Sequence, residues 1–272
     1  FLSSVNARIY IPQSVTDIEK KAFNDNAVIY GYANSAAEEF AKNNDIKFVA
    51  VNSHDEYLSL LTYSDTDNSS YKSAIDELSQ LGIINGFEDG TFKPQDNVTR
   101  AQAATMFATA LGYSDTKYQN IATDKAVFSD FLMSHWAYKY ADYVMKSADI
   151  SSGETNCILN GFEDGTFRPD NNVTIIQLLK MAICSLGEDG YMAEAVENGG
   201  YPNGYNTVAE KYGFSKGIAV DAINQPATRE QTAQIISNTI NMPIKRFGAI
   251  NSITADHKTE SEKFLVTYDG SK

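Results

Sequence analysis

The sequence is poor in the residues that build most catalytic and metal centres. Its 272 residues include two cysteines, three histidines and one tryptophan. The histidines, His54, His135 and His257, show no metal-ligand spacing. No P-loop and no Cys-x-x-Cys motif is present. We therefore expect neither a bound metal nor a cofactor.

Positive charge and long apolar runs are also scarce. Lysine and arginine total 22 against 35 aspartate and glutamate residues, so the net charge is -13 and the pI is near 4.6. This balance argues against nucleic acid and anionic membrane surfaces as partners. No run approaches the roughly 18 apolar residues of a membrane span, so membrane insertion is not expected.

What the sequence does contain is a block that occurs twice. Asn85 to Thr99 reads NGFEDGTFKPQDNVT and Asn160 to Thr174 reads NGFEDGTFRPDNNVT, identical at 12 of 15 positions and offset by 75 residues. A weaker third copy begins at Ala227, where ATREQTAQIISNTI aligns with VTRAQAATMFATAL. The repetition indicates an array of related units rather than one irregular enzyme fold.

Each unit is predicted to contain two helices around a turn. The spacing predicts a first helix over 71–81, with Ile75 and Leu78 on its apolar face and Gly82 as its stop. The Gly-punctuated segment 86–94 is a predicted loop, and Gly90 is the position in it that most needs a positive φ.

The second helix of each unit follows a repeated capping box. A threonine is followed three residues later by a glutamine in each copy: Thr99 and Gln102, Thr174 and Gln177, Thr228 and Gln231. Apolar positions at helical spacing come next and are predicted to be core: Ala104, Phe107, Ala108, Leu111, Leu179, Ala182, Ile183, Leu186, Ala233, Ile236 and Ile240. Because one helix pair cannot bury its apolar face alone, the copies should stack into a three-unit assembly over about 59–245.

These motifs resemble the S-layer homology domain family. The first copy carries Gly86 to Pro94 as the family's Gly-aromatic-x-Asp-Gly-Thr-Phe-x-Pro loop and Thr99-Arg100-Ala101-Gln102 as its helix start. The matching residues of the other copies are Phe128, Asp130, Trp136, Gly161 to Pro169, Gly200-Tyr201-Pro202 and Thr228-Arg229-Glu230. The resemblance implies a mainly α fold of three tandem helical units in a pseudo-threefold assembly. It also implies inter-unit grooves that bind a secondary cell-wall polysaccharide, often bearing pyruvate ketals.

The copies depart from the family pattern at three places. Ile175 stands where the family has an arginine, the third copy lacks the Asp-Gly-Thr-Phe loop, and the second has an insertion near 151–157. At most two of the three arginine sites survive.

The N-terminal region has a different resemblance. Residues 11–18, IPQSVTDI, resemble the last turn of a bacterial-surface leucine-rich repeat, and residues 30–51, with a predicted helix over 36–42, resemble its α/β cap. One repeat is too little for a working solenoid, which suggests that the sequence begins inside a longer protein. The more polar stretch from Phe247 is predicted to be a tail or the start of a further module, with a short strand at 264–266.

The predicted organisation follows from these boundaries. It comprises a leucine-rich repeat end and cap (1–54), three helical units (55–116, 117–188 and 189–246) and the tail or further module (247–272).

Arg100 and Arg229 are the leading candidates for ligand binding. Each follows the N-cap threonine, where a cation opposes the helix dipole, so helix stability does not explain the position. A helix N-terminus favours an anion, and a guanidinium can hold a carboxylate with two hydrogen bonds, which suits a pyruvate or uronate group. The alternative is a surface arginine paired with a nearby acid. The other predicted glycan-binding residues are Asp89, Gly90, Thr91, Phe92, Trp136, Asp164, Gly165 and Thr166.

Several further candidates have a structural alternative. The rings of Trp136, Phe92, Phe167 and Tyr205 suit stacking on sugars, with core packing or a groove wall as the alternative. A glycosidase needs two carboxylates facing each other ~5–10 Å apart, so the adjacent pairs Glu88-Asp89 and Glu163-Asp164 fit turn formation better. Cys184 is predicted to be a buried thiol, with a bridge to Cys157 as the alternative.

The sequence therefore predicts a non-catalytic, secreted module at the cell wall or cell surface that binds an acidic secondary cell-wall polysaccharide. A monomer with three internal units is favoured. Two alternatives stay open: a degenerate spacer without glycan binding, and the anchor of an enzyme whose catalytic module lies outside this sequence.

Overall fold

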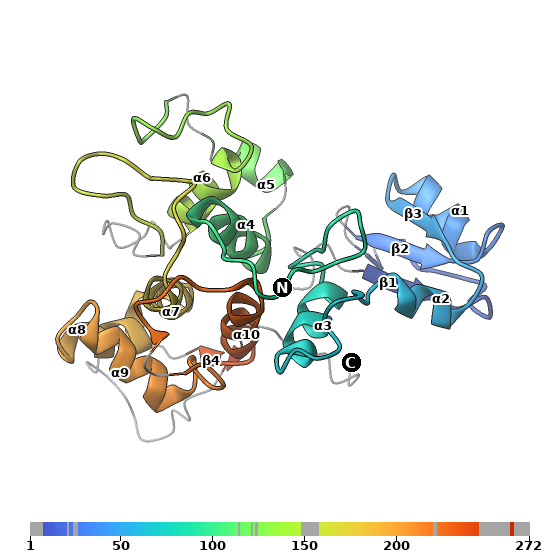
Figure 1. The fold of residues 1–272 in the computed structure, drawn as a ribbon. Coiled ribbons are helices and arrows are strands. Elements are labelled where there is room, and N and C mark those ends of the chain that lie inside the picture. Colours follow the sequence, from blue (N-terminus) through green and yellow to red (C-terminus); the bar gives the residue numbers. More distant parts are fainter. Residues whose placement is uncertain are drawn as a thin grey trace, which may run out of the picture.

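The chain folds into a small sheet region beside a larger helical body (Figure 1). The computed structural model describes residues 8–20, 22–23, 27–113, 115–120, 122, 125–147, 158–219, 222–244 and 262–263. The two parts meet where Arg8 donates a side-chain hydrogen bond to Asn85. Within the described residues the fold is mainly helical, as predicted.

The sheet region is a parallel three-stranded sheet between two short helices. Strands β1 (Arg8–Ile11), β2 (Val28–Gly31) and β3 (Lys47–Ala50) pair in that order. Helix α1 (Ala36–Asn43), predicted over 36–42, packs on one face, and α2 (His54–Ser59) packs on the other. The relation of this sheet to leucine-rich repeats stays a prediction.

Helix α2 belongs to the sheet region and not to the helical body. Ser53 caps it, and its Tyr57, with Leu61 just beyond it, packs against Tyr30 and Val51 of the sheet region. The predicted boundary between residues 54 and 55 therefore falls inside the sheet region. The short capping signal at Ser53 is easily missed because α2 has only 6 residues.

The helical body spans the three ranges predicted as units, 55–116, 117–188 and 189–246, which we call the first, second and third units. Its elements are α3 (Lys72–Gln80), α4 (Arg100–Ala110), α5 (Asp115–Gln119), α6 (Tyr138–Ser147), α7 (Ile175–Cys184), the π-helical turn η3 (Glu188–Met192), α8 (Ala193–Glu197), α9 (Asn203–Tyr212) and α10 (Arg229–Ile240). A two-residue ladder joins β4 (Pro243–Ile244) to β5 (Glu262–Lys263). The predicted strand at 264–266 and the insertion near 151–157 lie outside the described residues.

All three predicted capping boxes are present. Thr99, Thr174 and Thr228 each accept from the glutamine N–H three residues on, and each glutamine side chain accepts from its threonine N–H. Two donors at each helix start are satisfied in this way, so α4, α7 and α10 begin where the sequence indicates.

The helices pack between units more than within them. α6 of the second unit packs on α4 of the first, α9 of the third on α7 of the second, and α3 of the first on α10 of the third. Each unit thus covers the apolar stripe of its neighbour. One core cluster runs from Tyr63 to Ile240 and includes the predicted apolar positions, Leu111 being only partly buried.

A closed set of hydrogen bonds joins the units near the starts of α4, α7 and α10. The N–H of Val98 donates to Ala227 O, that of Ala227 to Val173 O, and that of Val173 to Val98 O, each at 2.9 Å. Each of these residues comes from a different unit. The backbone therefore links first, second and third units in a ring.

Cys184 does not carry the free thiol that we predicted. It is buried in α7 and disulfide-bonded. Cys157 is the other cysteine of the sequence and lies outside the described residues. An even cysteine count in a chain of this length carries little information, so the sequence alone does not decide between a thiol and a bridge.

Candidate functional site

Two loops with the repeated sequence are built as self-contained turns. Asp89 Oδ1 accepts from the Thr91 N–H at 3.0 Å and from Thr91 Oγ1 at 2.6 Å, and Gly90 between them has a φ of +78°. The second loop repeats this with Asp164 and Thr166, at 3.0 Å and 2.5 Å. Positive φ at the glycine was predicted and is confirmed.

An aspartate from the start of each unit holds its loop in place. The carboxylate of Asp65 accepts from the N–H groups of Phe92 and Lys93, both at 2.8 Å. Asp130 does the same for the second loop at 2.7 Å and 2.8 Å. Burial raises the pKa of Asp130, but the two N–H donors outweigh it and leave this pKa below its usual value.

Arg100 crosses from the first unit into the loop of the second. Its Nε donates to Phe167 O and its Nη2 to Asn160 O, both at 2.8 Å. The guanidinium carbon lies 4.9 Å from the centre of the Phe162 ring and 4.7 Å from that of Phe167. Arg100 is 7% exposed, and burial followed by the charge of Arg168 lowers its pKa to about 10.

Arg229 makes the same contact between the third unit and the first loop. Its Nε donates to Phe92 O at 2.7 Å and its Nη2 to Asn85 O at 3.0 Å, with the guanidinium over Phe87 and Phe92. It is 6% exposed. Both arginines are thus buried and bonded to carbonyls, which corrects the alternative of surface ion pairs. Their Nε and Nη2 atoms donate to backbone carbonyls, so this edge of the guanidinium cannot also bind a carboxylate with two hydrogen bonds as predicted.

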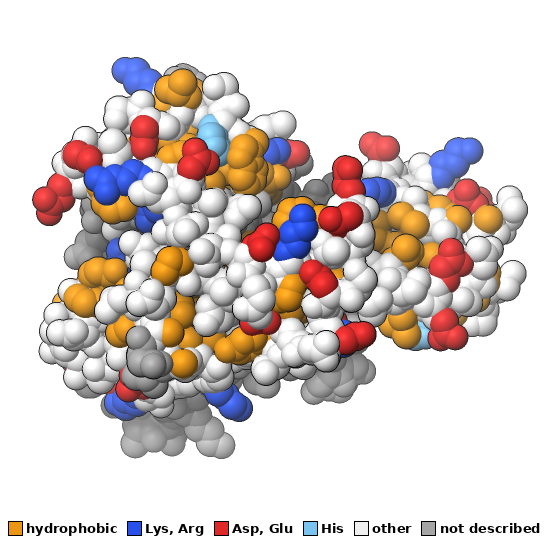
Figure 2. Space-filling view, in the orientation of Figure 1, with side chains coloured by type: hydrophobic (Ala, Val, Ile, Leu, Met, Phe, Trp, Pro, Cys, Tyr) orange, Lys and Arg blue, Asp and Glu red, His pale blue; other side chains and the backbone are white. Residues whose placement is uncertain are grey.

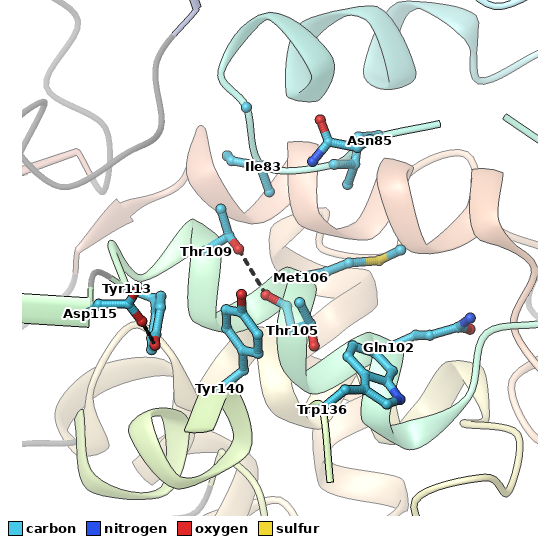
Figure 3. A pocket seen from close by; sticks show the side chains of 12 residues that line it. Ile83, Asn85, Gln102, Thr105, Met106, Thr109, Tyr113, Asp115, Trp136 and Tyr140 are labelled. Atoms are coloured by element: carbon cyan, nitrogen blue, oxygen red, sulfur yellow. Dashed lines mark hydrogen bonds between the residues drawn. The ribbon is translucent and has the colours of Figure 1, made fainter. Parts of the chain in front are cut away.

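A groove lies between α4 and the second unit, and we term it the α4 groove (Figure 3). Its volume is 350 Å³. It is lined by Gly82, Ile83, Ile84, Asn85, Gln102, Thr105, Met106, Thr109, Tyr113, Asp115, Trp136 and Tyr140. Trp136 is 57% exposed and forms part of the wall, so the groove-wall alternative for this residue is the one observed.

The α7 groove is the corresponding hollow between α7 and the third unit. Its volume is 180 Å³, and its lining is Arg100, Ile158, Leu159, Asn160, Gly161, Phe162, Gln177, Lys180, Met181 and Tyr201. Most of these residues stand 75 positions after a residue of the α4 groove, as Gln177 does after Gln102. Each groove therefore combines the loop and second helix of one unit with an aromatic residue of the next.

The groove aromatics have a sequence signal that our prediction missed. Tyr71, Trp136 and Tyr201 are spaced by 65 residues, and they stand just before α3, α6 and α9. Tyr201 is 50% exposed, like Trp136. The third aromatic, Tyr71, instead donates a hydrogen bond from its hydroxyl to Gly217 O at 2.9 Å, so its hydroxyl is bound to the protein itself.

The structure separates the predicted site residues into three groups. Trp136 and Arg100 line grooves, and Arg229 bonds to the groove residue Asn85. The turn residues Asp89, Gly90, Thr91, Asp164, Gly165 and Thr166 shape the loops and do not line either groove. Phe92, Phe167 and Tyr205 are buried, so core packing, the alternative given for these rings, is the arrangement that the structure shows.

One segment has the spacing of a serine nucleophile motif without its structural context. Gly213 to Gly217 reads GFSKG, which fits Gly-x-Ser-x-Gly. The motif requires a strand before the serine, whereas here the helix α9 precedes it and the Ser215 N–H donates to Ala209 O. The segment ends a helix and is not a nucleophile elbow.

Charges of both signs are distributed over the surface of the described residues. On the face in Figure 2, acidic side chains are scattered over both parts and the basic ones form no continuous patch among the described residues. The described residues include no group of three or more His, Cys, Asp or Glu side chains placed to hold a metal. None of the described helices is long and apolar enough to cross a membrane.

Two segments of the chain match a known domain family. Residues 62–104 and 127–174 match the S-layer homology domain. These stretches contain both turn loops and the starts of α4 and α7. The matches thus cover two segments of the chain, and residues 189–246 lie outside them.

The similar proteins include bacterial cell-surface proteins and an endoglucanase. Cell surface glycoprotein 1 of Acetivibrio thermocellus is 40% identical over 91 residues, and the cellulosome-anchoring protein of the same species is 36% identical over 92, each match covering 34% of this chain. An endoglucanase of a Bacillus species is 27% identical over 139 residues, or 51% of this chain. The matches span only 3%, 18% and 13% of these relatives.

Proposed function

We propose that the chain is a non-catalytic, secreted anchoring module that binds an acidic secondary cell-wall polysaccharide. The observation that carries this proposal is the pair of matched grooves, each with a glutamine, a buried arginine at or beside it and a half-exposed aromatic side chain. Aromatic faces with amides beside them suit the apolar and hydroxyl sides of a sugar ring. The domain matches and the cellulosome-anchoring relative support the same function.

Each groove is completed by more than one unit. The α4 groove takes its helix from the first unit and Trp136 from the second, while Arg229 from the third bonds to Asn85 at its edge. The α7 groove takes Arg100, α7 and Tyr201 from the first, second and third units. We infer a pseudo-threefold arrangement within one monomer, supported by the backbone ring of Val98, Val173 and Ala227.

The arginines then act mainly by holding the groove walls. Arg100 ties α4 to the loop that lines the α7 groove, and its remaining guanidinium surface borders that groove. Carboxylates of pyruvate ketals or uronates are the glycan groups that such a cation favours.

Sedimentation with cell walls tests the proposal. The purified chain should co-sediment with Gram-positive walls, and chemical removal of the secondary polysaccharide should abolish the binding. Trp136→Ala and Tyr201→Ala should each reduce the bound fraction several-fold, since stacking contributes ~1 kcal/mol. Tyr32→Ala, in the sheet region, is the matched aromatic control and should bind like the wild type. Equal binding by all four proteins would contradict the proposal.

A structural spacer is the second candidate, and the arginine contacts favour it. Both guanidinium groups satisfy carbonyls across unit boundaries, which explains their retention without any ligand. If this candidate is right, no wall binding occurs and the groove variants change nothing.

The endoglucanase relative suggests how the module is used. Only part of that enzyme is similar to this chain. The present chain would then be the wall-binding part of a longer protein whose activity resides elsewhere.

A further inference from the structure

The sheet region and the helical body are joined by one exposed residue. Leu61 is 3% exposed in the core of the sheet region, and Tyr63 is 8% exposed in the core of the helical body. Thr62 stands between them and is exposed. Both ends of this connection are fixed, because the Tyr63 hydroxyl also accepts from the Gly86 N–H at 3.0 Å. A movement of one part against the other is therefore a rotation about Thr62.

A side-chain hydrogen bond spans the angle between the two parts. Arg8, at the start of β1, donates it to Asn85 Oδ1 in the first unit. Two domains of one chain move relative to each other by default unless their interface is large and apolar. This contact is polar and exposed, so it holds the sheet region at one orientation about Thr62 only while the hydrogen bond is made. We term it the Arg8 latch.

Asn85 also belongs to the α4 groove. It lines the groove together with Gln102 and Trp136, and its backbone oxygen accepts from Arg229 of the third unit. None of the described lining residues comes from the sheet region. Arg8 therefore reaches Asn85 from outside the groove, and one amide connects the sheet region to the groove wall.

The latch fixes which way the Asn85 amide faces. A guanidinium has only hydrogen-bond donors, so it can meet the oxygen of an amide but not its nitrogen. In Figure 3 the Asn85 oxygen points away from α4, and the nitrogen lies on the side of the groove. No described residue accepts a hydrogen bond from this nitrogen. The amide thus presents a donor to the groove as long as Arg8 holds its oxygen.

We propose that Arg8 is a positioning residue for the α4 groove: it turns the Asn85 amide so that Nδ2 donates to an oxygen of the bound sugar, and it thereby couples the orientation of the sheet region to occupation of the groove. The ligand in this assignment rests on the proposed function, whereas the latch itself does not. A donor that is oriented in advance binds more tightly, since the cost of ordering it is met before binding. Such coupling is reciprocal, so a ligand on Nδ2 also favours the latched orientation.

NMR and fluorescence together test the assignment. Residual dipolar couplings report whether one alignment describes both parts of the chain, and they need no added label. The emission of Trp136 reports binding in the α4 groove during titration with polysaccharide released from Gram-positive walls. The variants are Arg8→Met, the conservative Arg8→Lys, Asn85→Asp and the control Lys47→Ala, whose lysine is exposed on β3 of the same sheet.

The expected results separate the latch from the donor. One alignment should fit both parts of the wild type, whereas the two parts of Arg8→Met should need separate alignments. Arg8→Met should weaken the binding seen at Trp136 roughly fivefold, the size of one neutral hydrogen bond, and Arg8→Lys should restore part of the loss. Asn85→Asp should keep the latch, now as an ion pair, yet weaken binding as much, because the donor is gone. Lys47→Ala should match the wild type in both measurements.

Each failure has its own signature. If Arg8→Met leaves one alignment for both parts, or leaves binding at Trp136 unchanged, the assignment of Arg8 is overturned while the proposed function stands. If Asn85→Asp binds as well as the wild type, the donor role of the amide is overturned. If the wild type binds no polysaccharide, the proposed function and the positioning role fail together, and the alignments still decide whether the latch exists.

Discussion

The starts of α4, α7 and α10 each contact a neighbouring unit through the same backbone hydrogen bonds. Two of these three contacts also include an arginine, whereas the third, at the start of α7, has Ile175 instead. The first two N–H groups of α4 donate to Asn171 O and Pro169 O, and those of α10 donate to Asp96 O and Pro94 O. Those of α7 donate to Gln225 O and Ile223 O at 3.1 Å and 2.7 Å. Only the side chains differ: Arg100 and Arg229 meet a loop phenylalanine and its carbonyl, whereas Ile175 is buried without such a loop.

This difference shows what the arginine depends on. An arginine is kept where the facing unit has the Asp-Gly-Thr-Phe loop, and isoleucine replaces it where the facing third unit has lost that loop. A buried guanidinium is tolerated only when hydrogen-bond acceptors surround it, so the absence of the loop in the third unit accounts for the absence of an arginine at position 175. Whether an arginine is present therefore depends on the loop of the facing unit and not on the helix that bears the residue.

The largest expected effect comes from putting the arginine back at the third contact. Ile175→Arg would bury a cation with no loop carbonyls of the kind that Arg100 has, so we expect a loss of about 3–5 kcal/mol in the free energy of unfolding, or failure to fold. Urea unfolding followed by circular dichroism measures this. Ile175→Val, which removes one methylene, is the control and should cost about 1 kcal/mol. If the Ile175→Arg protein were as stable as Ile175→Val, an arginine at this position would not depend on the loop carbonyls of the facing unit.

The next effect is the loss of an existing arginine. Arg100→Met and Arg229→Met each leave the carbonyl of a buried phenylalanine and that of an exposed asparagine without their arginine donor, and we expect each to cost about 2–4 kcal/mol in the same assay. Arg168→Met is the matched control, because its pair with Asp164 is exposed and should contribute less than about 1 kcal/mol. Costs for Arg100→Met and Arg229→Met that are below about 1 kcal/mol, as expected for Arg168→Met, would contradict a structural role for the inter-unit arginines.

A smaller, pH-dependent effect belongs to the loop aspartates. Because the folded-state pKa of Asp130 is lowered, its contribution is complete above the unfolded value of about 3.9 and is lost as pH falls through the lower folded value. Asp130→Asn should cost about 1 kcal/mol near pH 6, given its exposure, and the difference from wild type should shrink below about pH 4. Unfolding free energies from pH 2 to 6 measure it; a difference that grows at low pH would contradict the assignment.

The smallest effect is expected at the tip of the turn. Gly90 has a φ of +78° and open space where a Cβ would stand, so Gly90→Ala meets only the backbone cost of about 1 kcal/mol. Gly90→Asn should cost less, because asparagine tolerates this conformation. Thermal unfolding of the two variants should rank them in that order, and the reverse order would show that packing rather than φ sets the preference.

Features set by neighbouring residues were predictable from the sequence. The capping boxes, the glycine φ and the buried stripes of α4, α7 and α10 each depend on residues within one or two turns. The groove aromatics were also within reach, since Tyr71, Trp136 and Tyr201 recur at a fixed spacing.

Features set by contacts between units were not predictable. Arg100 meets a carbonyl 67 residues away and Arg229 one 137 residues away, and no local pattern names those partners. The same holds for Phe92, for which the sequence leaves sugar stacking and core packing open, and which packs under Arg229. The disulfide of Cys184 is likewise a tertiary contact.

The most direct test of glycan binding uses the single tryptophan of the chain. Trp136 lies in the wall of the α4 groove, so its fluorescence reports on that groove alone. Titration with polysaccharide released from Gram-positive walls should change the emission and saturate, with the change following the bound fraction seen in sedimentation. Saturable wall binding with no change at Trp136, and undiminished by Trp136→Ala, would contradict the account.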